Sequence, residues 1–211
     1  MKKRYLMAAF AAVLVSANAN AEFILGGDVG FASTTGDVKD NANDYGYDSS
    51  SFGVFGRYIL AAQPGKGAFG VHVGYASESG DVSSACTNDM TVKCSSLESK
   101  NTIDIMGVYR TAEFGRGWSG LLMAGYSRLK AEFEFEDNVT INSVDVSGRS
   151  KSATHSGYKL AAGVQKTFGQ WSTQTLIQYA DYGDETYAIE GIESKIDMSS
   201  LGLRVGIAYH F

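Results

Sequence analysis

The chain alternates apolar and polar residues with a period of two in eight separate segments. This pattern predicts β-strands with one apolar face, because successive side chains of a strand point to opposite faces. The last segment is the most regular, with apolar residues at every second position from Leu201 to Phe211. The segments lie at about residues 23–31, 51–60, 69–76, 103–110, 119–135, 158–168, 171–179 and 201–211.

The fifth segment is the least regular of the eight. We assign its face by keeping the larger apolar residues together on the outer side: Leu121, Met123, Leu129, Phe133 and Phe135. This phase predicts that the charged residues between them point inward: Arg128, Lys130, Glu132 and Glu134.

The connections between the segments alternate in length. Short ones lie at about 62–67, 113–117 and 169–170, and long polar ones at about 35–48, 79–100, 137–153 and 183–196. Outer-membrane barrels have this layout, with the short turns in the periplasm and the long loops outside. The stretch 133–146 alternates on both sides of Asp137 and Asn138, which predicts a hairpin turn and a β-ribbon that continues strands five and six past the membrane.

The polarity of the two faces distinguishes a membrane barrel from a soluble one. One face is almost entirely Leu, Ile, Val, Phe and Tyr, while the other mixes glycine with isolated charged residues. A lipocalin-type barrel or a β-sandwich, the soluble alternatives, would turn the apolar face inward. Aromatic residues also gather near both ends of the segments, as in the girdles of membrane barrels. The expected fold is all-β, an eight-stranded antiparallel up-and-down transmembrane β-barrel.

The first 21 residues have the organisation of a secretory signal peptide. Lys2, Lys3 and Arg4 precede an apolar run from residue 6 to 15, and an Ala-Asn-Ala triplet ends at Ala21. The run of about ten apolar residues is too short to span a bilayer, which needs about 20. We therefore expect residues 1–21 to be cleaved and residues 22–211 to form the barrel domain.

The final strand, with its alternating apolar residues and terminal Phe211, resembles the C-terminal signal of outer-membrane proteins. Together with the length, the signal peptide and the strand layout, it makes the chain similar to small barrels of the OmpA transmembrane-domain, OmpX and opacity-protein type. The resemblance implies a Gram-negative outer membrane, contact with its lipid and lipopolysaccharide, and recognition of Tyr209 and Phe211 by the barrel-assembly machinery. In OmpX-like barrels a protruding ribbon is thought to bind partners by strand addition.

The predicted inner face carries both acidic and basic residues. An eight-stranded barrel has room for side chains and little else, and buried charges must be paired or solvated. We favour a plug of paired charges over the alternative, a polar channel. The predicted lumen residues are Asp28, Arg57, His72, Asp104, Arg110, Arg128, Lys130, Lys159, Arg204 and His210.

Cys86 and Cys94 are the two cysteines of the chain and lie in the second long connection. In an oxidising compartment a pair so close in sequence predicts a disulfide that closes the loop. No histidine lies in that loop, and the acidic residues of the first loop lack the spacing of a calcium-binding loop. We therefore predict no metal and no cofactor.

The sequence narrows the function without defining it. A formal net charge of −5 makes nucleic acid an unfavourable partner. His155 and Ser156 are neighbours and should point to opposite faces, which argues against a catalytic triad and against an enzyme. We expect a non-enzymatic surface protein with a structural, adhesion or host-interaction role, whose extracellular loops contact a host or matrix ligand. The alternatives are a narrow porin-like channel for small solutes and, third, an enzyme that modifies lipid A.

Overall fold

The computed structural model describes residues 21–38, 44–60, 65–86, 89–135, 140–141, 144–145, 147–189 and 192–211. Residues 1–20 lie outside this part, so the signal peptide remains a prediction. No helix in the described ranges is long and apolar enough to cross a membrane. The strands are β1 (Glu22–Val38), β2 (Asp44–Ile59), β3 (Ala68–Cys86), β4 (Asp89–Arg110), β5 (Trp118–Phe135), β6 (Thr140–Ile141), β7 (Val144–Asp145), β8 (Ser150–Phe168), β9 (Trp171–Ile189) and β10 (Ile192–His210).

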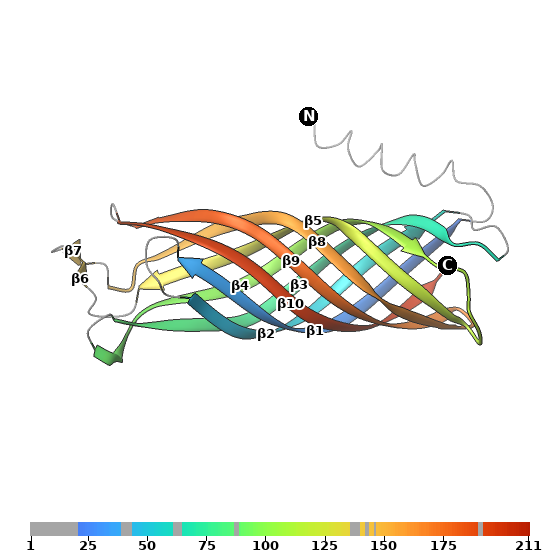
Figure 1. Cartoon of the computed structure of the whole chain (residues 1–211), viewed down its shortest axis with the longest axis horizontal. Coiled ribbons are helices and arrows are strands. Elements are labelled where there is room, and N and C mark those ends of the chain that lie inside the picture. The colour runs from blue at the N-terminus through green and yellow to red at the C-terminus, as the bar shows by residue number, and fades with distance from the viewer. Residues whose placement is uncertain are drawn as a thin grey trace, which may run out of the picture.

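Eight of these strands close into one barrel in the order β1-β10-β9-β8-β5-β4-β3-β2, and β6 and β7 form a separate hairpin (Figure 1). Each neighbouring pair is antiparallel, and β1 closes on β10 with Ile24 opposite His210. The predicted eight-stranded antiparallel barrel is therefore confirmed. The first and last strands also meet at the chain ends, where the amide of Phe211 donates to the carbonyl oxygen of Phe23 over 2.9 Å.

A belt of exposed apolar side chains surrounds the barrel over part of its height. Toward the long-hairpin end this belt stops at the same level on every strand. We call the last residue of each strand's exposed apolar series the upper girdle: Phe31, Phe52, Tyr75, Ile103, Tyr126, Tyr158, Tyr179 and Leu201. Beyond it, no described large apolar side chain on the barrel strands is exposed.

The strands continue past the upper girdle, and the predicted long loops are largely wrong. β1 runs to Val38 and β2 begins at Asp44, while β3 and β4 are separated only by residues 87–88. Residues 183–196 likewise belong almost entirely to β9 and β10. These segments are polar because their outer faces meet water, and polar side chains at alternate positions are compatible with a strand. We call this part of the molecule the extension.

Within the extension the barrel wall divides along two seams. Pairing of β2 with β3 ends at Ser50 and Ser79, and pairing of β8 with β9 ends at Tyr158 and Asp181. Above these points β3, β4, β5 and β8 stay paired with one another, as do β2, β1, β10 and β9. We call the two groups sheet I and sheet II. The hairpins accordingly spread apart at the end opposite the C-terminus (Figure 1).

The two sheets enclose an apolar core. Its buried residues come from both sheets: Leu97, Leu129, Ala131, Phe133 and Phe135 from sheet I, and Tyr47, Ala180, Tyr182, Tyr187, Ile196 and Met198 from sheet II. The rings of Phe133 and Tyr187 lie 5.6 Å apart between centroids, and the hydroxyls of Tyr47 and Ser99 are hydrogen-bonded across the core. The extension is thus a small β-sandwich on top of the barrel.

The predicted phase of the fifth segment was wrong. Leu121, Met123, Leu129, Phe133 and Phe135 are buried, whereas Leu122 and Tyr126 face outward. In the lower half of β5 both faces are apolar, so polarity cannot choose between them. In the upper half, water replaces lipid outside the wall and the apolar face turns inward. Consequently Arg128 and Lys130 are exposed on the outer surface and do not belong to the lumen.

The strand register shifts at three places just above the upper girdle: between Ser77 and Gly80 of β3, and at β-bulges on β4 and β9. The bulges on β4 and β9 reverse the inside–outside phase of their strands. On β4 the register with β5 shifts at Lys100, so that Ser99 and Thr102 are both buried while Lys100 and Asn101 both lie on the outer side. On β9 the register with β10 shifts at Tyr182, which points into the core. Bulges commonly redirect side chains in this way.

The predicted ribbon of strands five and six exists, but the end of strand five pairs with residues 149–151 and not with residues 139–146. β5 and β8 remain paired up to Glu134 and Ser150, and the amide of Phe135 donates to the carbonyl oxygen of Arg149 over 2.9 Å. The expected turn at residues 137–138 lies outside the described residues. The hairpin that the structure does contain pairs Thr140–Ile141 with Val144–Asp145.

The sandwich core predicts unequal effects for neighbouring residues of β5. Phe133→Ala should lower the free energy of unfolding by ~3–5 kcal/mol, because it opens a cavity between the sheets. Glu134→Ala, at the adjacent outward position, should change it by less than ~0.5 kcal/mol. Urea unfolding from lipid vesicles measures both. Equal effects of the two substitutions would contradict the inward phase of Phe133.

Candidate functional site

The interior of the barrel is the first candidate site, and its mouth at the end that holds Glu22 and His210 is polar. Arg110 Nη1 lies 2.6 Å from Glu22 Oε2, and the imidazole of His210 contacts the same carboxylate. The other ring nitrogen of His210 lies 2.7 Å from Ser172 Oγ. An open cavity of about 480 Å³ adjoins this cluster and is lined by Glu22, Arg110 and the turn residues beside them. These groups join β1, β4, β9 and β10 at the mouth.

Immediately inside the mouth the lumen is filled by apolar side chains. This lower cluster consists of Ile24, Phe55, Ile59, Ala68, Met106, Val108, Leu121, Met123, Ala161, Leu176 and Ala208. Arg57 crosses it and is 1% exposed. The guanidinium donates to Gln165 Oε1 over 3.2 Å and to Gln174 Oε1 over 2.9 Å, so amide oxygens solvate this charge. The lumen is therefore occupied by packed side chains at this height.

Two buried ion pairs lie between the lower cluster and the sandwich core. Lys159 Nζ is 2.8 Å from Asp104 Oδ2, and Ser127 Oγ donates to the other oxygen of Asp104 over 2.6 Å. Arg204 Nη1 is 3.1 Å from Asp28 Oδ1. The second pair joins residues that are 176 positions apart, across the closing pair of strands β1 and β10. Buried charges are tolerated in this form because each has an opposite charge at contact distance.

The predicted lumen residues can now be placed. Asp28, Arg57, His72, Asp104, Lys159, Arg204 and His210 are buried inside, and Arg110 lies at the mouth. His72 stacks on Phe55, with ring centroids 5.4 Å apart. Arg128 and Lys130 are the two exceptions, on the outer wall. The predicted set of lumen residues did not include Glu22, Ser127 or the two glutamines that hold Arg57.

His155 and Ser156 lie on opposite faces of β8, as expected for strand neighbours. His155 is buried, with Nε2 2.8 Å from the hydroxyl oxygen of Tyr187 and Nδ1 3.3 Å from the carbonyl oxygen of Gly183. Ser156 is exposed. The histidine therefore connects β8 to β9 at the base of their seam. Among the described residues, no group of three His, Cys, Asp or Glu side chains could hold a metal ion.

Two other sets of predicted residues belong to the strand ends. Cys86 ends β3 and Cys94 lies in β4, but the side chains of both are outside those described, so the disulfide remains a prediction. Tyr209 and Phe211 pack with Trp171 and Phe23 in an aromatic cluster at the short-turn end of the barrel, with ring centroids 4.9–5.8 Å apart. Their recognition by the assembly machinery also remains a prediction.

No protein-family model and no curated protein sequence matches this chain. Solved structures do match. OprG from Pseudomonas aeruginosa superposes with a TM-score of 0.55 at 13% identity, covering 92% of this chain and 97% of that one. A major outer membrane protein from Thermus thermophilus gives 0.52 at 13%, with 92% and 100% covered. Ail of Yersinia pestis, in complex with the heparin analogue sucrose octasulfate, gives 0.51 at 13%, with 90% and 99% covered.

At these identities the likeness concerns the fold. The chain has the fold of the small outer-membrane β-barrels, as its resemblance to that group implied. The closed ladder and the apolar belt suit the same environment, because a membrane-spanning sheet must pair every backbone group and expose apolar side chains to lipid. The chain therefore has the fold of an outer-membrane barrel, with the extension on the side opposite Glu22 and Phe211.

The buried ion pairs predict a specific pattern of stability. Lys159→Met leaves the Asp104 carboxylate buried without its partner and should cost ~3–5 kcal/mol of unfolding free energy. Adding Asp104→Leu removes the orphaned charge and should recover most of that loss. Lys195→Met, which breaks an exposed pair with Asp184, should cost less than ~1 kcal/mol. Urea titration of the refolded barrels in vesicles distinguishes these outcomes. If adding Asp104→Leu to Lys159→Met lowered the unfolding free energy further, the buried pairing would be refuted.

Proposed function

We propose that the protein is a non-enzymatic surface-binding protein of the outer membrane, with an adhesion or host-interaction role carried by the extension. The observation that supports this most directly is the pair of seams, which leaves strand edges of both sheets without a neighbouring strand. An unpaired edge offers a row of backbone donors and acceptors to an extended polypeptide. The proposed partner is therefore an extended segment of a host or matrix protein.

The β8 edge is the best suited to strand addition. Thr167 donates its amide to the Gly117 carbonyl oxygen over 2.8 Å, and Arg149 accepts from Phe135, so these odd-numbered residues direct their backbone groups toward β5. The register of β8 with β5 contains no bulge. The even-numbered residues between them consequently direct their amides and carbonyls toward the seam. These are Ser150, Ser152, Thr154 and Ser156.

The side chains along this edge favour an incoming strand. Proteins usually protect an exposed edge with proline or with charged residues that repel another strand. Here the four seam-facing positions carry small hydroxyl side chains, and the core between the sheets holds the edge in place without a neighbour. Adjacent Lys151 is the one charged side chain between residues 150 and 157.

A proline at the β8 edge tests strand addition directly. Thr154→Pro removes one seam-facing amide but spares the β5 ladder, so binding to a matrix partner should weaken about tenfold while the barrel still folds. Thr154→Ala keeps the amide and should bind like the original protein. The measurement is adherence of bacteria that display each full-length variant to immobilised collagen, laminin and fibronectin and to cultured epithelial cells.

Heat-dependent electrophoretic mobility verifies that each displayed variant is folded. If no surface binds the original protein, the proposed adhesion role is rejected. If the original and both variants adhere equally, strand addition at β8 is rejected.

The packed interior weighs against the channel alternative. The lower cluster, the two ion pairs and the sandwich core follow one another along the lumen. We therefore expect purified protein in a planar bilayer to show no discrete conductance steps at neutral pH. Reproducible steps that disappear on substitution of a lumen residue such as Arg57 would contradict the plug and restore the channel hypothesis.

A further inference from the structure

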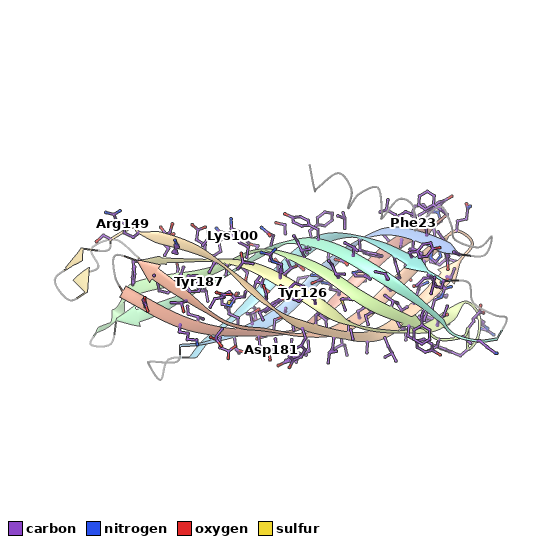
Figure 2. All side chains as sticks on the ribbon, turned by 90° about the horizontal axis from the view of Figure 1, so that it is seen from above. Phe23, Lys100, Tyr126, Arg149, Asp181 and Tyr187 are labelled. Carbon is purple, nitrogen blue, oxygen red and sulfur yellow. The ribbon has the colours of Figure 1, made fainter. Side chains whose placement is uncertain are left out.

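A cluster of cations occupies the outer wall just above the lipid-facing belt. Arg128 and Lys130 lie on β5, at the first two outward positions beyond Tyr126 of the upper girdle. Lys100 lies on β4 at the bulge beside them, where Asn101 is opposite Lys130 and Ile103 is opposite Arg128. Along the barrel axis, Lys100 is found between Tyr126 and Arg149 (Figure 2). The three cations therefore stand on two adjacent strands, at successive positions just above the belt.

The bulge is what adds the third cation. In a regular strand Lys100 and Asn101 would point to opposite faces, and one of them would enter the sandwich core. The extra residue places both on the outer side instead, while Ser99 and Thr102 remain buried. The backbone is thus irregular at the point where it brings a lysine to the outer surface.

The surrounding charges give the cluster a direction. Glu98 and Glu132, which pair with Lys100, lie on the side away from the membrane. Arg128 is the cation nearest the belt, and no ion pair involves it within the described part of the chain. Among the described residues, Arg128 therefore faces the lipid side without a carboxylate partner, whereas the two glutamates partly neutralise Lys100 on the side that faces water.

The other strands carry no comparable cluster at this height. The described outward side chains immediately above the upper girdle are hydroxyls or a carboxylate on the remaining strands: Ser33, Ser50, Ser77, Ser156, Asp181 and Ser199. The chain is also acidic overall, with a formal net charge of −5. The three cations therefore form a local positive cluster on an acidic protein and are not part of a generally basic surface.

We propose that Lys100, Arg128 and Lys130 form a binding site for phosphate groups of the anionic glycolipid in the outer leaflet. Phosphates of such a lipid lie at the boundary between acyl chains and water, the height at which the belt ends and the cations begin. Arginine and lysine bind phosphate by charge-assisted hydrogen bonds, and basic residues at this boundary strengthen binding to anionic lipids. The acyl chains of the same molecule would lie against the apolar belt below.

The test is a titration of the full-length protein, extracted from membranes in detergent, with fluorescent bisphosphoryl lipid A in mixed micelles. Arg128→Gln combined with Lys130→Gln should raise the dissociation constant about 25-fold, or about fivefold for each cation removed. Lys166→Gln is the matched control, since this exposed lysine lies over Trp118 at the opposite membrane boundary. Its affinity should not change. Heat-dependent mobility confirms that each variant is folded.

Further arms identify the ligand. Dephosphorylated lipid A should bind the original protein as weakly as bisphosphoryl lipid A binds the double variant, and inorganic phosphate at the same concentration should not displace the lipid. Equal affinities of the double variant and the original protein would overturn the proposal. A cluster that binds sucrose octasulfate in preference to lipid A would also overturn it, in favour of a sulfated glycan. Adherence is a separate measurement, so failure here leaves the strand-addition hypothesis to its own test.

Discussion

The structure depends on one constraint: the medium outside the wall changes from lipid to water at the upper girdle. Below that level a backbone group without a partner has no solvent to bond with, so the ladder must close completely. Above it, water satisfies such groups and the ladder is free to divide. Both seams begin at this transition, at Ser50 and Ser79 on one side and at Tyr158 and Asp181 on the other. The same transition exchanges the polarity of the two faces.

This exchange explains how much of the fold the sequence could predict. Segments inside the belt alternate in one sense, with apolar residues outward, and that pattern was sufficient for the number, order and closure of the strands. The extension alternates in the opposite sense, so its strands were mistaken for polar loops. β5 shows the limit most clearly, because Leu129 and Phe133 point inward and pack in an apolar core, as apolar residues do in a soluble protein. The bulges at Lys100 and Tyr182 are a second limit, since no local pattern reveals a register shift of one residue.

The interior was predictable in kind but not in its pairings. A charged residue on the inner face of a narrow barrel implies a partner, and Asp28, Asp104, Lys159 and Arg204 all have one. Which residue is the partner depends on closure, strand tilt and neutral donors such as Ser127, and none of these can be read along the chain. Arg128 and Lys130 were assigned to the lumen on the strength of their neighbours' phase. Their actual position, outside and directly above the belt, is what makes them candidates for contact with lipid phosphate.

The sandwich core also determines which parts of the extension are free to bind. If backbone pairing alone held the extension together, the seams would be weak points and an added strand would disturb the barrel. Instead, side chains such as Phe133 and Tyr187 pack together across the core between the two sheets. His155 of β8 is hydrogen-bonded to Tyr187 of β9 where the seam between these strands begins. The β8 edge and the cation cluster lie on the same sheet but use different groups, backbone amides in one case and outward side chains in the other. A partner at the edge and a lipid at the girdle can therefore be bound together, because neither requires the sheets to separate.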